Sequence, residues 1–71
     1  MIVNRLSEIM GRKRLSRRDV VRGTGLAINT VGGLYNGTAK RVDLETLDKL
    51  CFFLGVTVGE ILEHSEENVD A

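Results

Sequence analysis

Residues 15–31 read Leu15-Ser16-Arg17-Arg18-Asp19-Val20-Val21-Arg22-Gly23-Thr24-Gly25-Leu26-Ala27-Ile28-Asn29-Thr30-Val31. Ser16 is a good N-cap for a helix over about 17–23, and Asp19 lies in its first turn. Gly25 stands where the chain must reverse. A further short helix over about 28–35 follows, so this stretch predicts two helices joined by a tight turn, a helix-turn-helix.

The apolar pattern on either side predicts three more helices. The first covers about 4–12 with Asn4 as its cap, and the fourth starts after Asp43. The fifth starts after Thr57, which forms a capping box with Glu60. The apolar residues expected to face inward are Leu6, Ile9, Met10, Val20, Leu26, Val31, Leu34, Leu44, Leu47, Leu50, Cys51, Leu54, Val58, Ile61 and Leu62.

We therefore expect an all-α fold, a compact domain of five helices over residues 1–63. His64 is expected at the end of the fifth helix, where its charge would complement the helix dipole. The acidic stretch from Glu63 onward has almost no apolar residues, so residues 64–71 are predicted to be a flexible C-terminal tail.

Length and composition exclude several classes of protein. The chain has 71 residues, no proline and one cysteine, Cys51, so it forms no disulfide within itself. No apolar run approaches the roughly 20 residues of a membrane span. No Ser, Cys or His stands in a context for catalysis or at metal-ligand spacing, so we expect no enzyme, metal site, cofactor or small-molecule ligand.

Charge is divided between the two halves of the chain. The total is zero, but residues 1–41 hold nine Lys and Arg against two carboxylates, a net charge of +7, and residues 42–71 carry −7. This division predicts a basic face for a polyanion and an acidic far side. A solvated surface whose two halves attract each other is the alternative.

Together these residues resemble the lambda-repressor-like helix-turn-helix family, of the Cro and xenobiotic-response-element type. The resemblance covers about residues 2–62. The motifs that carry it are Leu15-Ser16-Arg17-Arg18-Asp19-Val20, Thr24-Gly25-Leu26, Asn29-Thr30-Val31, Leu34-Tyr35-Asn36-Gly37, Leu44-Glu45-Thr46-Leu47, Leu50-Cys51, Leu54-Gly55-Val56 and Glu60-Ile61-Leu62.

The resemblance implies a five-helix domain that binds double-stranded DNA with its third helix in the major groove. The positions that would contact bases are Arg17, Ile28, Asn29, Thr30, Gly32 and Gly33. The positions that would contact phosphates are Ser16, Asn36, Thr38, Lys40 and Arg41. It also implies a transcriptional regulator, most simply a repressor, in the cytoplasm at the nucleoid. Most members of the family act as dimers, and an exposed Phe52 is a candidate dimer contact.

Three residues depart from the family pattern. Ala27 stands where a capping Ser or Thr is usual, and Gly32 and Gly33 lie inside the third helix. Each glycine weakens the helix by about 1 kcal/mol and offers no side chain to a base. One alternative is therefore DNA binding without sequence preference. Another is a module of the same fold whose third helix binds a protein, as an antitoxin or an anti-repressor does.

Overall fold

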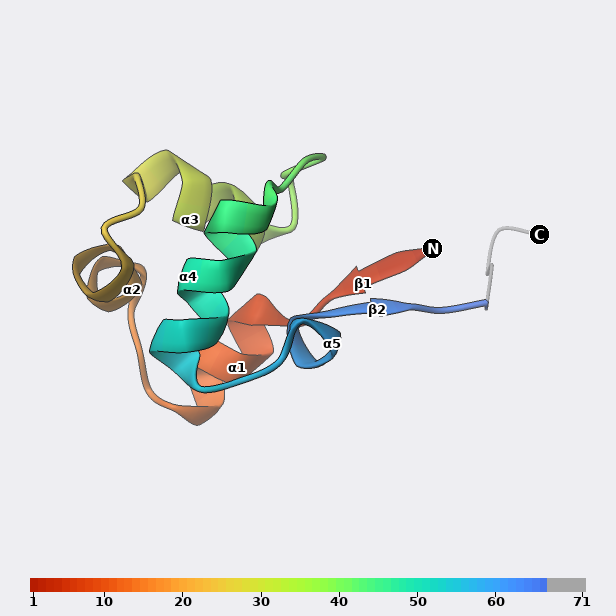
Figure 1. Cartoon of the computed structure of the whole chain (residues 1–71), viewed down its shortest axis with the longest axis horizontal. Coiled ribbons are helices and arrows are strands. Elements are labelled where there is room, and N and C mark those ends of the chain that lie inside the picture. Colours follow the sequence, from red (N-terminus) through yellow and green to blue (C-terminus); the bar gives the residue numbers. More distant parts are fainter. Residues whose placement is uncertain (67–71) are drawn as a thin grey trace.

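The computed structural model describes residues 1–66, and within them it contains five helices and one two-stranded sheet. The elements in chain order are β1 (Ile2–Asn4), α1 (Leu6–Arg12), α2 (Arg17–Thr24), α3 (Ile28–Asn36), α4 (Leu44–Leu54), α5 (Val58–Ile61) and β2 (Leu62–His64). In Figure 1, α2 and α3 lie together at one side of the helical body, and the two strands project from the opposite side. The expected five-helix fold is confirmed.

Three of the helices, α2, α4 and α5, begin where their capping residues predict. The Ser16 hydroxyl accepts the Asp19 N–H at 3.1 Å, and the Asp19 carboxylate accepts the Ser16 N–H at 2.8 Å. The Asp43 carboxylate accepts the Thr46 N–H at 2.9 Å at the start of α4. Each bond satisfies a backbone donor that a helix start otherwise leaves without a partner, so the caps fix these boundaries locally.

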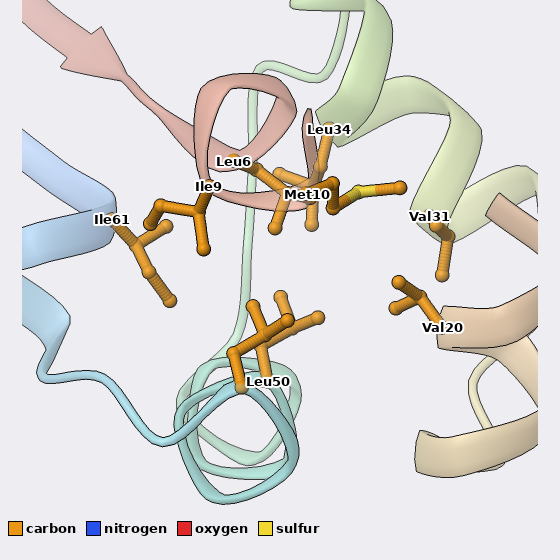
Figure 2. Close-up of a cluster of buried hydrophobic side chains, with 9 residues drawn as sticks. Leu6, Ile9, Met10, Val20, Val31, Leu34, Leu50 and Ile61 are labelled. Carbon is orange, nitrogen blue, oxygen red and sulfur yellow. The ribbon is translucent and has the colours of Figure 1, made fainter. Parts of the chain in front are cut away.

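The core is built from side chains of every helix (Figure 2). Met10 from α1 points toward Val31 of α3, and Val20 of α2 lies next to Val31. The buried apolar residues are Leu6, Ile9, Met10, Val20, Val31, Leu34, Leu47, Leu50, Leu54 and Ile61. Leu26 and Cys51 are only partly buried against this cluster.

The strands were not predicted. Residues 2–4 form β1, which pairs antiparallel with β2 so that Ile2 lies opposite His64 and Val3 opposite Glu63. Their side chains are suited to a strand, but the pairing joins the two ends of the chain, which no local pattern indicates. The expectation that Leu62 and His64 extend the fifth helix is wrong, because α5 ends at Ile61.

Of the expected C-terminal tail, only residues 64–66 belong to the described part of the chain. His64 lies in β2, and the Ser65 N–H donates to the Met1 carbonyl at 2.8 Å. Residues 67–71 lie outside the described residues, so a flexible tail over them stays a prediction.

The N-cap residue of α1 is Arg5, so the expectation that Asn4 caps this helix is wrong. Asn4 bonds the start of the helix from one position before the cap. Its Oδ1 accepts the Leu6 N–H at 2.9 Å, and its Nδ2 donates to the Leu34 carbonyl at 2.8 Å. The helix starts at Leu6 rather than at about residue 4, and the same side chain ties its start to the C-terminal part of α3.

Two residues expected to face inward are exposed instead. Leu44, at the start of α4, is 82% exposed, and Val58 is 48% exposed. Both lie in the first turn of a helix, where the core does not reach. Phe52 is 90% exposed, as expected, whereas Phe53 packs against the core cluster.

Gly23 provides a close contact between α2 and α4. A Cβ at this position would lie 2.0 Å from Cε1 of Phe53. We therefore expect Gly23→Ala to lower the free energy of unfolding by about 1–3 kcal/mol in urea denaturation, since the aromatic ring must move. Gly11→Ala is the control: nothing lies within 4 Å of a Cβ at this exposed position of α1, so the variant should gain up to about 1 kcal/mol. If both variants gain stability, the ring does not need this space.

Ala27 leaves the start of α3 without a cap. It occupies the N-cap position with an extended backbone (φ −68°, ψ 147°), and no side chain bonds the first N–H groups of the helix. Ala27→Ser should raise the free energy of unfolding by about 0.5–2 kcal/mol, because its hydroxyl accepts one of these N–H groups. Thermal unfolding measures this gain, and Ala27→Val, which adds no oxygen, should not produce it. Equal effects of Ser and Val would contradict the capping explanation.

Candidate nucleic-acid interface

The turn between α2 and α3 is fixed by Thr24 and Gly25. Gly25 has φ +76°, in the left-handed region that favours glycine. The Thr24 hydroxyl donates to the Val20 carbonyl at 2.6 Å and accepts the Leu26 N–H at 3.2 Å. These bonds set the direction in which α3 leaves the turn.

The outer face of α3 is polar but uncharged. Val31 and Leu34 are buried on the inner face, whereas Asn29 and Thr30 are exposed and Ile28 is 51% exposed. The whole helix holds no acidic or basic residue. Its exposed side chains therefore offer hydrogen-bonding groups and one aliphatic contact to a partner.

The two glycines of α3 have different surroundings. Nothing lies within 4 Å of a Cβ placed on Gly32, whereas one on Gly33 would lie 3.5 Å from the Ala39 Cβ. The Gly33 carbonyl also accepts the N–H groups of Thr38 at 2.9 Å and Ala39 at 3.1 Å. Gly32 thus faces open space, and Gly33 packs against the loop that follows the helix.

Two shallow depressions flank the start of α3. The depression toward α2, of about 440 Å³, is lined by Ser16, Arg17, Arg18 and Ile28. The depression toward the loop after α3, of about 430 Å³, includes Asn29, Thr30 and Arg41. Five of the six predicted base-contact residues therefore line these two depressions: Arg17 and Ile28 the first, and Asn29, Thr30 and Gly33 the second. Gly32 lines neither of them.

The predicted phosphate-contact positions extend from the start of α2 to the loop after α3. All five are exposed: Ser16, Asn36, Thr38, Lys40 and Arg41. The Ser16 hydroxyl accepts the Asp19 N–H at the start of α2. Lys40 lines a groove that Ile2 and His64 of the strands also line.

The cations of this surface are free of carboxylates. Within residues 1–66, Arg5 pairs with Glu63 and Glu8, and Arg22 pairs with Asp19. No ion pair occupies Arg17, Arg18, Lys40 or Arg41 in that part of the chain. Arg18 lines two depressions beside Ile28, although it was not among the predicted contact residues. Its sequence context gave no indication of the face toward which its side chain points.

Asp19 and Asp43, which lie in sequence close to the predicted contact residues, take part in the N-terminal capping of α2 and α4. Hydrogen bonds from the Ser16 backbone and hydroxyl hold the pKa of Asp19 below its usual value. Hydrogen bonds from the side chain and backbone of Thr46 lower the pKa of Asp43 in the same way. Both groups are therefore ionised at neutral pH and directed at backbone N–H groups.

Arg17 and Tyr35 meet across the helix-turn-helix. The guanidinium carbon of Arg17 lies 5.3 Å from the centre of the Tyr35 ring, within the range of a cation–π interaction. Arg17 is the first residue of α2, and Tyr35 is near the end of α3. Residues this far apart in the sequence give no local signal of their contact.

The rest of the described chain offers little reactive chemistry. Desolvation raises the pKa of the Cys51 thiol, so the thiol is protonated at neutral pH. Residues 1–66 contain no group of three His, Cys, Asp or Glu side chains able to hold a metal ion. None of their helices has the length and apolar character needed to cross a membrane.

An apolar patch lies on α4. Leu44 and Phe52 are 82% and 90% exposed, and their spacing of eight residues places them on one face of the helix. Asp48 lies between them on the same face. We call Leu44 and Phe52 the α4 patch.

Known proteins resemble the chain over almost its whole length. The family model for the Cro/C1-type HTH DNA-binding domain matches residues 5–67. The transcriptional repressor RstR of the cryptic phage CTXphi, from Vibrio cholerae, is 31% identical over 70 residues, which are 99% of this chain. The chain spans 62% of the length of that relative. Because the family match includes all five helices, the chain belongs to the Cro/C1-type helix-turn-helix family of DNA-binding domains.

Proposed function

We propose that this protein is a sequence-specific transcriptional regulator, a repressor, that inserts α3 into the major groove of its operator. The observation that supports this most is the uncharged, exposed face of α3, with cations on both sides that form no ion pair within residues 1–66. A groove in DNA presents base edges between two rows of phosphates, and this surface has the complementary arrangement. The relative from Vibrio cholerae is named a transcriptional repressor, which agrees with this role.

The proposed base contacts lie around the first turn of α3. Arg17 has the geometry to donate two hydrogen bonds to guanine, and Asn29 can exchange two with adenine. Ile28 would contact a thymine methyl group, and Thr30 a base edge. Gly32 would permit close approach of the helix backbone. Gly33 was expected in this set, and its packing against Ala39 supports a role in holding the loop instead.

The proposed phosphate contacts surround this centre. Ser16 would bind one strand at the start of α2, and the remaining four would bind from the end of α3 and its loop: Asn36, Thr38, Lys40 and Arg41. Such contacts fix the register of the protein on the duplex and provide affinity that depends on salt.

The α4 patch supports a dimer. The Phe52 side chain is 90% exposed, and a second copy that covered its ring would remove it from water. A twofold dimer would place its two α3 helices in successive major grooves, about 34 Å apart. The expected operator is therefore a near-palindrome.

The second candidate is a protein-binding module that uses the same face of α3. The absence of charge from that helix favours it, because an uncharged face suits a protein surface as well as a groove. Salt dependence separates the two candidates: DNA binding weakens steeply with salt, whereas an apolar protein contact does not.

Substitutions in the two contact sets should have different effects. Arg17→Ala and Asn29→Ala should each reduce the free-energy difference between specific and nonspecific binding by about 1–3 kcal/mol without loss of the fold. Lys40→Ala should weaken binding to all sequences and reduce the slope of log affinity against log salt by about one. Fluorescence anisotropy with an operator selected from a random duplex library, over a salt series, measures both.

Lys49→Ala is the matched control for Lys40, since Lys49 is an exposed lysine in the acidic half of the chain. It should leave affinity and salt slope unchanged. An unaltered specificity ratio in both Arg17→Ala and Asn29→Ala would refute the base-contact assignment. A folded wild-type protein that enriches no sequence from the library would refute sequence-specific binding itself.

Phe52→Asp should make the protein monomeric. A carboxylate at the centre of an apolar contact is buried without a partner, so association should weaken at least tenfold, by about 1.4 kcal/mol or more. Sedimentation equilibrium measures the mass. Ile28→Asp, an equally polar change on α3, should leave the mass of a dimer intact while it abolishes operator binding. A wild-type monomer, or a dimer that survives Phe52→Asp, would contradict the use of this patch.

A further inference from the structure

Arg17 is held by an aromatic ring rather than by a carboxylate. Its guanidinium lies over Tyr35 at 5.3 Å from the ring centre. By contrast, the arginines at positions 5 and 22 pair with Glu63 and Asp19. Within residues 1–66, no hydrogen bond or ion pair engages the Arg17 side chain.

This difference determines what Arg17 has available for a ligand. A carboxylate occupies the N–H groups at the edge of a guanidinium, whereas an aromatic ring interacts with its charge and leaves those donors free. Guanine is recognised through two acceptors, O6 and N7, which need two of these donors side by side. The Tyr35 ring therefore restrains Arg17 without using the groups that read a base.

The backbone segment that carries the Tyr35 ring is held in place by its neighbour Leu34. Tyr35 follows Leu34, whose side chain is buried in the core and whose carbonyl accepts a hydrogen bond from Asn4. Tyr35 is 39% exposed, and Arg17 lies over its ring. The backbone that carries the ring is thus fixed by bonds independent of DNA.

We propose that Tyr35 is a positioning residue for base recognition: its ring holds the Arg17 guanidinium in the conformation that donates to a guanine in the major groove. The proposal rests on the proposed function and goes beyond it, since Tyr35 need not touch the DNA. A long arginine side chain that is ordered before binding loses less conformational entropy on contact, so the benefit appears only at the base pair that Arg17 reads.

The test uses the full chain and a library of random duplexes at about physiological salt. The wild-type selection gives the operator, and Arg17→Ala identifies the guanine whose preference depends on Arg17. The affinity ratio between that operator and one with adenine at the same position is then measured for Tyr35→Leu and Tyr35→Phe.

Tyr35→Leu should lower this ratio about two- to fivefold, the range of a cation–π interaction at an exposed site. Its nonspecific affinity and salt slope should equal those of the wild type. Tyr35→Phe retains the ring and should keep the wild-type ratio. In the Arg17→Ala background, Tyr35→Leu should cause no further loss. The control is Asn36→Ala, at the adjacent residue of α3, which should weaken binding to both duplexes by the same factor.

Several results would overturn the proposal. An unchanged guanine preference in Tyr35→Leu shows that the ring does not position Arg17. An equal loss in Tyr35→Phe shows that the hydroxyl acts, through its own contact. A loss that persists in the Arg17→Ala background, or that extends to nonspecific DNA, shows a structural role only. A wild-type selection without any motif refutes the proposed function itself, and this inference with it.

Discussion

The packing of Val31 and Leu34 into the shared core holds the third helix, and the proposed reading of DNA depends on it. α3 has little stability of its own, because it lacks a side-chain cap at Ala27 and carries two internal glycines. Its position is therefore set from outside, by Val20 and Met10 on its inner face and by the hydrogen bond from Asn4 to Leu34. These contacts with the core hold the outer face of α3 in a fixed orientation, although the helix has little stability of its own.

Hydrogen-bonding groups and positive charges lie on different elements of this surface. The helix supplies groups that form hydrogen bonds and no charge, while α2 and the loop after α3 supply cations that no carboxylate of residues 1–66 occupies. The negative charge of the chain is concentrated elsewhere: in residues 42–71, of which the described part forms α4, α5 and β2. A chain of zero net charge thus carries most of its cations in residues 1–41 and most of its carboxylates in residues 42–71.

Much of the fold was predictable because its signals are local. Ser16, Asp43 and Thr57 mark helix starts through bonds to residues three positions away, and the spacing of Leu47, Leu50 and Leu54 marks an inward face. The strands, the second bond of Asn4 and the stack of Arg17 on Tyr35 join residues distant in sequence, so no local pattern contains them. Leu44 was misplaced because periodicity gives the face of a helix but not where the core ends. The family resemblance supplied the contact residues, and those remain predictions.

The most direct test of the account is to map the DNA-binding surface by NMR. Amide shifts of the labelled protein would be followed while the selected duplex is added. The account predicts the largest changes at the start of α2, along α3 and in the loop over residues 37–41, with small changes in α5 and the β1–β2 ribbon. Changes concentrated on the ribbon or on the outer face of α4, with α3 unaffected, would contradict the claim that α3 is the helix that reads DNA.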